Sequence, residues 1–246
     1  MTRIFDSQSF KQTYDSAVVH GHFQEEPAYY PRYRFRYETL LREYCARLEA
    51  HPTDVLEVGG GQLALLARLL WKDRAVVADL PGPHHDYLHS HGVETVVWNI
   101  TGEEDLTQQR FDAIFFSEVI EHLPIPGHRA LERLRTLLKP GGWIICSTPN
   151  LYRIRNIVYL AAGKRIFDHF RQPTDSGLGH VLEYSRDHLE WQFREAGFEH
   201  IEIDLRQLHH FPKNPLIRVM SWLGSPLMLM PRFRDNLVAV ARAPSS

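Results

Sequence analysis

The chain has 246 residues, of which 43% are hydrophobic, and a formal net charge of −2 at pH 7. This composition supports one substantial core, gives no global field for long nucleic acid, and contains no uninterrupted apolar run of the roughly 18 residues that a transmembrane segment needs. Its two cysteines form no disulfide or metal pattern and its N-terminus lacks a signal-peptide core, so we expect a cytoplasmic protein.

Residues 1–50 are expected to form an N-terminal helical cap, because they are rich in aromatic side chains and carry an amphipathic run over 37–48. Residues 51–246 are expected to form the core, with acceptor-side insertions at about 151–180 and 206–233. The arginines at 32, 34 and 36 and the cations at 153, 155, 164 and 165 read as local basic surface patches.

Seven short apolar runs alternate with helix-like segments along the core. This alternation predicts an α/β fold with a doubly wound, Rossmann-like sheet that is mostly parallel. The last strand is expected to be antiparallel, because the Pro-containing segment before it offers no ordinary crossover helix. The predicted strands are 55–58, 75–78, 95–98, 113–116, 143–147, 201–205 and 237–241.

A glycine turn, Gly59 to Gly61, follows the first predicted strand and leads into a helix over 63–70. Glycines let the backbone bend tightly and approach a ligand, and the helix start presents N–H groups. The junction therefore predicts a cofactor site. Glu57 would repel the pyrophosphate of a nicotinamide dinucleotide and would favour the cationic amino-acid end of S-adenosylmethionine.

The second predicted strand ends at Asp79, whose carboxylate can accept both ribose hydroxyls of an adenosine. A turn cap before Pro81 is the alternative role of this residue. The spacing of Gly59, Gly61 and Ala64 also satisfies the relaxed dinucleotide fingerprint. An NAD-type oxidoreductase therefore stays an alternative, as does a catalytically inactive module that binds S-adenosylmethionine.

Four blocks give the chain a resemblance to class I S-adenosylmethionine-dependent methyltransferases over roughly residues 35–242: VLEVGGGQ at 55–62, VVAD at 76–79, FDAIFFSEVIEHLP at 111–124 and LKPGGWIICSTPN at 138–150. In that family the first block holds the methionine portion, the acid of the second holds the ribose, the end of the third strand flanks the adenine, and the fourth-strand block faces the reacting methyl. The resemblance implies cofactor contacts from Glu57, Gly59, Gly60, Gly61, Asp79, Asn99, Ile100, Ser117 and Glu118.

Two positions depart from the family pattern. Leu63 stands where a third glycine is usual, and Asn99 stands where an acid is common. The amide carbonyl of Asn99 can still accept a hydrogen bond from an adenine amino group.

Glu118, Glu121 and His122 are expected to share one helix face, because they are spaced i, i+3 and i+4. Two carboxylates and an imidazole at the catalytic edge form a candidate site for Mg²⁺ or Mn²⁺, with His180 as a fourth candidate ligand. The arrangement resembles that of metal-dependent small-RNA 2′-O-methyltransferases. It also resembles ubiquinone-pathway O-methyltransferases, which share the block SEVIEH.

Metal-free catalysis is the alternative, because Glu-His-Leu after the fourth strand is widespread in methyltransferases that use no metal. There Glu118 and His122 only shape the active site.

The sequence thus predicts transfer of a methyl group to an oxygen acceptor, in the form of a small-molecule, sugar or lipid-linked hydroxyl. His122 or His180 is expected to act as the base, since an imidazole titrates near pH ~6.5, and Glu118 is the third candidate catalytic residue. The two insertions are expected to cover the cofactor and build the acceptor pocket. The apolar stretch 216–231 is expected to make a weak membrane-surface contact.

Overall fold

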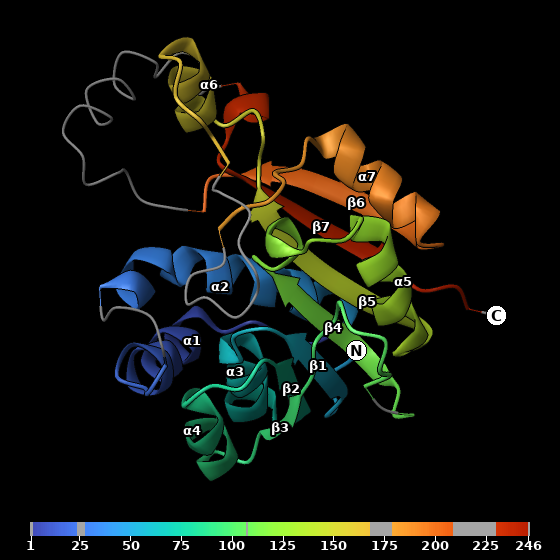
Figure 1. Cartoon of the computed structure of the whole chain (residues 1–246). Coiled ribbons are helices and arrows are strands. Elements are labelled where there is room, and N and C mark those ends of the chain that lie inside the picture. The colour runs from blue at the N-terminus through green and yellow to red at the C-terminus, as the bar shows by residue number, and fades with distance from the viewer. Residues whose placement is uncertain (1, 24–27, 107, 168–178, 209–229, 246) are drawn as a thin grey trace.

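A seven-stranded sheet forms the centre of the computed structural model, which describes all residues except 1, 24–27, 107, 168–178, 209–229 and 246 (Figure 1). The strand order is β3-β2-β1-β4-β5-β7-β6. The strands are β1 (Asp54–Val58), β2 (Arg74–Asp79), β3 (Glu94–Val97), β4 (Phe111–Ser117), β5 (Leu138–Pro149), β6 (Glu199–Arg206) and β7 (Asn236–Arg242). All seven predicted strands are therefore present.

The strand directions confirm the predicted fold class. Pairs from β3 through β5 are parallel, whereas β7 is antiparallel to both β5 and β6. The chain thus forms an α/β, mostly parallel sheet with an antiparallel last strand. Strand β1 lies between β2 and β4, and all five of its residues are buried, as expected of a strand covered on both faces.

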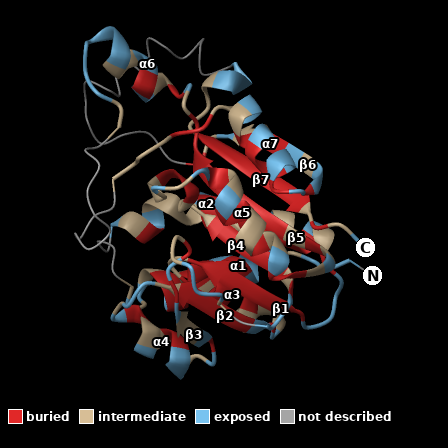
Figure 2. Ribbon diagram, turned by 45° about the vertical axis from the view of Figure 1, so that its right-hand side comes forward, coloured by how far each residue is buried: buried red, intermediate tan, exposed pale blue. Residues whose placement is uncertain are grey.

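Helices cover both faces of the sheet (Figures 1 and 2). Alternate side chains of the strands point to opposite faces: Val55 and Phe115 belong to one hydrophobic cluster, and Leu56 and Phe116 to the other. The first cluster packs against α1 (Ser7–Tyr14), the π-helix η1 (Asp15–Val19), α2 (Tyr29–Arg47), α3 (Gln62–Trp71) and α4 (His84–Ser90). The second packs against α5 (Gly127–Thr136) and α7 (Arg186–Glu195).

The N-terminal segment packs directly on the sheet. Tyr14 and Tyr44 are fully buried and share a cluster with strand residues. Arg3 forms a buried ion pair with Asp73 at 2.6 Å, and the Tyr44 hydroxyl donates to the same carboxylate at 2.7 Å. The segment predicted as a cap thus contains α1, η1 and α2, while the domain boundary at residue 50 stays a prediction.

Three short elements lie after the carboxyl ends of the strands or just before β7. They are the 3₁₀ turn η2 (Ile120–His122) after β4, α6 (Ile154–Ala161) after β5, and η3 (Pro231–Phe233) before β7. The predicted insertion at 151–180 therefore begins with α6. The apolar stretch 216–231 lies outside the described residues except for its last two positions. In the described part of the chain, no helix combines the length and hydrophobicity needed to cross a membrane.

Candidate active site

The glycine turn after β1 requires glycine at three successive positions. Gly59, Gly60 and Gly61 have φ values of 82°, 77° and 100°, in the left-handed region that other residues adopt at a cost. A Cβ at Gly59 would lie 2.8 Å from Cγ2 of Val119, which follows β4. The turn therefore packs closely against the loop after β4, and helix α3 begins immediately after it, close to the predicted start.

Glu57 holds this turn through a hydrogen bond to the start of helix α3. Its side chain is buried, and its Oε2 accepts the backbone N–H of Ala64 in the first turn of α3 at 2.7 Å. A carboxylate is stabilised there by the helix dipole and the unpaired amides. Burial raises the pKa of Glu57 to about 8, although hydrogen bonds from backbone amides act to lower it. Below about pH 8 the Glu57 side chain is therefore a neutral carboxyl group that holds the turn, and direct contact with a cationic cofactor stays a prediction.

Glu57→Gln is expected to flatten the pH dependence of stability. An unfolded glutamate ionises near 4.5, whereas folded Glu57 keeps its proton up to about pH 8. In that window the folded state binds more protons, so the free energy of unfolding falls as pH rises, by about 1.4 kcal/mol per pH unit from this group, and levels off above pH 8. Urea denaturation across this range measures the slope. Exposed Glu49→Gln is the control, and an undiminished slope in the Glu57 variant contradicts the expectation.

Asp79 joins the tip of β2 to the glycine turn. Its Oδ2 accepts the Gly60 N–H at 3.0 Å, its Oδ1 accepts the Leu80 N–H at 2.7 Å, and His84 Nε2 lies 3.4 Å from Oδ2. Burial acts to raise the pKa of Asp79, but the hydrogen bonds from His84 and the two amides lower it below its ordinary value. The carboxylate is therefore ionised and is placed beside the turn, where a ribose contact was predicted.

The residues after β3 lie at the same edge. Trp98 donates its N–H to the carbonyl of Asp79 at 2.9 Å, which brings the end of β3 to the end of β2. Asn99 is exposed, and its Oδ1 accepts from the N–H and hydroxyl of Thr101 at 3.0 and 2.8 Å, while Ile100 is buried. The structure thus gathers the predicted cofactor residues of β1, β2 and β3 at one edge.

The predicted helix over 118–122 is wrong. Glu118 has a φ of +55°, so only the three-residue turn η2 forms after it. Tertiary contacts hold Glu118: its N–H donates to the Ser147 carbonyl at 2.8 Å, and its Oε1 accepts from the Ser147 hydroxyl at 2.8 Å and from Asn236 at 3.3 Å. The Ser117 hydroxyl forms a hydrogen bond with the same Ser147 hydroxyl, with 2.8 Å between the two Oγ atoms. Glu118 therefore does not share a helix face with Glu121 and His122.

Arg36 faces Glu118 from helix α2. Its Nη2 lies 3.4 Å from Glu118 Oε2, its Nη1 donates to the Tyr29 hydroxyl at 3.0 Å, and its guanidinium lies 4.5 Å from the Tyr33 ring centroid. Arg36 is only 5% exposed, so it does not belong to the surface patch that the sequence indicated. The sequence analysis did not identify Arg36 as a site residue. Its position within a run of aromatic residues was the signal that could have indicated burial.

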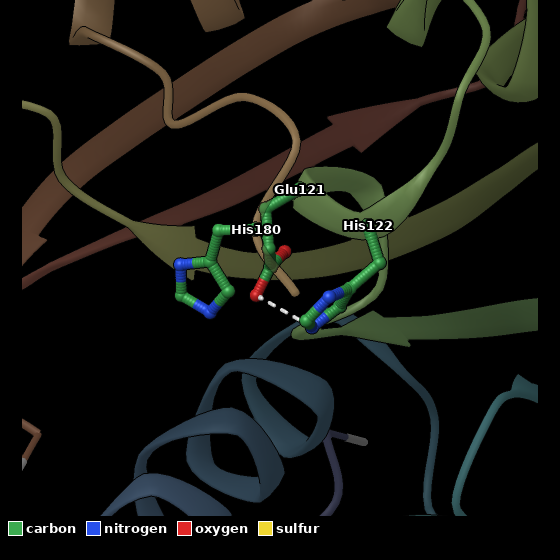
Figure 3. Close-up of side chains that lie close together, drawn as sticks. All are labelled: Glu121, His122 and His180. Atoms are coloured by element: carbon green, nitrogen blue, oxygen red, sulfur yellow. Dashed lines mark ion pairs between the residues drawn. The ribbon is translucent and has the colours of Figure 1, made fainter. Parts of the chain in front are cut away.

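Glu121, His122 and His180 form a compact group (Figure 3). One ligand atom from each lies within 4.8 Å of the others, and His122 Nε2 is 3.8 Å from Glu121 Oε1. The two imidazoles lie on either side of the carboxylate, with ring centroids 5.0 Å apart. Three of the four predicted metal ligands are thus together, whereas Glu118 is not part of this group.

Outer hydrogen bonds orient all three members of this group. His122 Nδ1 lies 3.1 Å from the Gly179 carbonyl, and His180 Nδ1 lies 2.8 Å from Glu183 Oε1. A carbonyl and a carboxylate only accept, so each Nδ1 carries a proton, and the neutral form of each ring has its lone pair on Nε2. Thr148 donates to Glu121 Oε2 at 2.9 Å. Such partners characteristically orient metal ligands and catalytic histidines.

The Glu121 carboxylate is the unusual member. Its residue is 1% exposed, and its Oε1 has no hydrogen-bond partner among the residues that the structure describes. Burial, followed by the nearby charge of Glu118, raises the pKa of Glu121 well above its ordinary value. A buried carboxylate oxygen left without a donor is costly, and a bound cation or a proton would offset that cost.

Glu183 is a second residue that sequence reasoning missed. It is fully buried and accepts from Arg153, from Asn156 at 2.5 Å, and from His180. Burial acts to raise its pKa, but the His180 hydrogen bond and the charge of Arg153 lower it. The ionised carboxylate thereby fixes the orientation of His180. The spacing His180-x-x-Glu183 was the only sequence signal for it.

Comparison with known proteins identifies the family and the fold. The model of the methyltransferase domain family matches residues 30–203. The ubiquinone biosynthesis O-methyltransferase of Chromobacterium violaceum is 26% identical over 178 residues, covering 68% of this chain and 71% of that protein.

Solved structures share the architecture. A S-adenosylmethionine-dependent methyltransferase from Clostridium acetobutylicum superposes with a TM-score of 0.58 at 12% identity, covering 96% of this chain and 98% of that one. Phosphoethanolamine N-methyltransferase 2 of Haemonchus contortus, in complex with S-adenosyl-L-methionine, gives 0.56 at 14% identity, covering 95% and 56%. At these identities the likeness shows the fold. Because the family model spans most of the chain, from α2 into β6, the protein belongs to the methyltransferase domain family.

Proposed function

We propose that the protein is an S-adenosylmethionine-dependent O-methyltransferase whose acceptor is a small-molecule, sugar or lipid-linked hydroxyl. The observation that carries this proposal is the pair of oriented imidazoles beside buried Glu121, at the sheet edge that also holds the glycine turn. The name of the Chromobacterium relative supports an oxygen acceptor. The Haemonchus neighbour, an N-methyltransferase, shows that the fold alone does not select the acceptor atom.

The cofactor edge fits S-adenosylmethionine in two respects. Three successive glycines leave the turn without side chains, so a ligand can approach the backbone closely, and ionised Asp79 lies beside the turn as an acceptor for ribose hydroxyls. S-adenosylmethionine supplies an electrophilic methyl group on a sulfonium. The chain supplies the surrounding edge, with Asn99, Ile100, Ser117 and Glu118 at the ends of β3 and β4.

His122 and His180 are placed to remove the acceptor proton. In the neutral rings the Nε2 lone pair is available, because Nδ1–H is engaged with the Gly179 carbonyl or with Glu183. Ionised Glu183 stabilises the imidazolium that forms when His180 takes up a proton. Holding the hydroxyl against the base contributes the orientation that transfer requires.

As the alternative to base catalysis, we propose that Glu121, His122 and His180 hold a divalent cation, Mg²⁺ or Mn²⁺, through the same Nε2 lone pairs. The unsatisfied Glu121 Oε1 and the outer hydrogen bonds on both imidazoles fit such a site. Two nitrogen donors suit Mn²⁺ better than Mg²⁺, which prefers oxygen. Glu118 is not one of these ligands, because its carboxylate contacts Arg36 and Ser147 instead. A bound cation would supply Lewis-acid stabilisation of the acceptor oxygen.

One assay tests both parts of the proposal. Methyl transfer from labelled S-adenosylmethionine is measured on matched panels of hydroxyl and amine acceptors, before and after exhaustive chelation, with Mn²⁺ or Mg²⁺ then added back. We expect transfer to hydroxyls, loss of turnover on chelation and recovery with the metal. Transfer to amines alone contradicts O-methylation, and full activity after chelation contradicts the metal site. Binding of S-adenosylmethionine without transfer to any acceptor would indicate an inactive binding module.

A further inference from the structure

Helix α6 and its N-cap residue bury polar side chains and leave two apolar side chains exposed. Its first turn packs inward through Arg153 and Asn156, which are 7% and 0% exposed and bind Glu183. One turn further, Ile157 is 40% exposed and Leu160 is 59% exposed. A helix on a protein surface normally buries its apolar side chains and exposes its polar ones, so buried Asn156 and exposed Ile157 and Leu160 depart from the usual pattern.

The exposed part of α6 has an apolar side and a cationic side. Ile157 and Leu160 are spaced i, i+3 and share one side. On the other side, Arg155 and Lys164 lie 5.0 and 5.8 Å from the ring centroid of Tyr159. The sequence has no acidic residue from 151 to 167. An apolar side opposite a cationic side that includes a tyrosine is the composition of helices that lie in a membrane interface.

The charge of this segment contrasts with that of the whole chain. The formal net charge of the protein is −2, whereas Arg155, Lys164 and Arg165 are all exposed within one short stretch. Tyr152, at the start of the same segment, is 54% exposed. We call Tyr152, Arg155, Ile157, Leu160 and Lys164 the α6 surface. Figures 1 and 2 show α6 projecting from the sheet edge with much of its surface exposed.

The α6 surface is coupled to the candidate active site. Arg153 and Asn156 join the first turn of α6 to Glu183, and Glu183 binds His180 Nδ1 at 2.8 Å. In addition, Asn150, just before this segment, donates to the Arg232 carbonyl at 2.9 Å, which brings η3 alongside. A surface that docks through α6 would therefore hold the acceptor side of the site close to whatever it binds.

We propose that the α6 surface docks on an anionic lipid bilayer, with Ile157 and Leu160 inserted among the acyl chains and Arg155 and Lys164 among the headgroups. Anionic lipid matches both halves of this surface, because it offers negative charge above an apolar interior. A single short helix gives weak, reversible attachment. Binding is measured without cofactor or acceptor, so this inference stands or fails separately from the proposed methyl transfer.

Vesicle sedimentation tests the proposal with the full chain. We expect the protein to pellet with vesicles of phosphatidylcholine mixed with phosphatidylglycerol, far more than with phosphatidylcholine alone, and to be released as salt is raised. The variant I157E/L160E is expected to weaken binding about tenfold or more. The variant R155E/K164E is expected to weaken it by a similar factor, on the anionic vesicles only.

Matched variants separate the α6 surface from general changes. Ile4→Glu places an acid at another exposed apolar position, 80% exposed and outside α6, and K11E/R110E changes the net charge by the same amount as R155E/K164E. Both should bind as the unchanged protein does, and circular dichroism checks folding throughout.

Three results overturn the proposal. They are absence of pelleting with either vesicle, equal loss in the matched variants, and unchanged binding of I157E/L160E. A dimer in solution that I157E/L160E converts to a monomer, without any vesicle binding, would instead make α6 an interface between two copies.

Discussion

His180→Ala is expected to lower kcat by about 10²-fold or more, and His122→Ala to do the same. Each imidazole has its Nδ1 held by an acceptor and lies beside the buried Glu121 carboxylate. Removal of either one deletes a base or a cation ligand at the centre of the group. Steady-state kinetics with the acceptor identified from the hydroxyl panel measures the loss.

The pH profile and metal content of the variants separate the two roles. A base variant loses the acidic limb of the kcat profile but still binds Mn²⁺, whereas a ligand variant loses Mn²⁺ in direct titration. His51→Ala is the control, because that imidazole is exposed and, within the described part of the chain, its ring nitrogens hydrogen-bond only to Pro52 and Glu49. Unchanged kcat in both site variants would show that His122 and His180 are neither bases nor metal ligands and contribute only to packing.

The sheet and the glycine turn were predictable because their signals are local. Short apolar runs between turn residues indicate buried parallel strands, and the run Gly59 to Gly61 allows the positive φ values of a tight turn, which other residues adopt only at a cost. Six of the observed strands contain the predicted ranges and extend them at one or both ends, whereas β3 is shifted by one residue, from the predicted 95–98 to Glu94–Val97. Burial on both faces leaves little freedom in where each strand lies, so a sequence pattern suffices to locate it.

The geometry after β4 was not predictable, because distant residues determine it. The spacing of Glu118, Glu121 and His122 fits a helix, but contacts from Ser147 and Asn236 hold Glu118 at a positive φ. Tertiary contacts thus override local periodicity. His122 and His180 still lie beside Glu121, but the three-residue turn η2 places Glu121 and His122 there, not a helix.

Arg36 and Glu183 escaped notice for a related reason. Each is a charged residue that is usually exposed in proteins, and only its partner reveals that it is buried. The partner of Arg36 lies after β4, and the partners of Glu183 include Arg153 and Asn156 on α6. A single sequence does not show such pairings, so the residues that support the site were found only in the structure.

Arg36→Ala is expected to destabilise the protein by about 3–5 kcal/mol, because it leaves the Glu118 carboxylate in the site without its cation. The Arg36 side chain is 6% exposed and that of Glu118 is 18% exposed, so water can replace little of the lost interaction. Loss of the guanidinium also removes its contacts with Tyr29 and Tyr33 on the same helix, α2. Urea denaturation measures the free energy of unfolding.

A matched surface variant and a double variant test the reason for that loss. Arg194→Ala breaks an i,i+4 pair with Glu190 on helix α7, in which the arginine side chain is 68% exposed, so it should cost only about 0.3–0.5 kcal/mol. If the unpaired Glu118 charge causes the loss, R36M/E118M should recover much of the stability, because two apolar side chains leave no buried charge unpaired. A double variant as unstable as the sum of its single variants would show instead that Arg36 acts through its aromatic contacts, independently of Glu118.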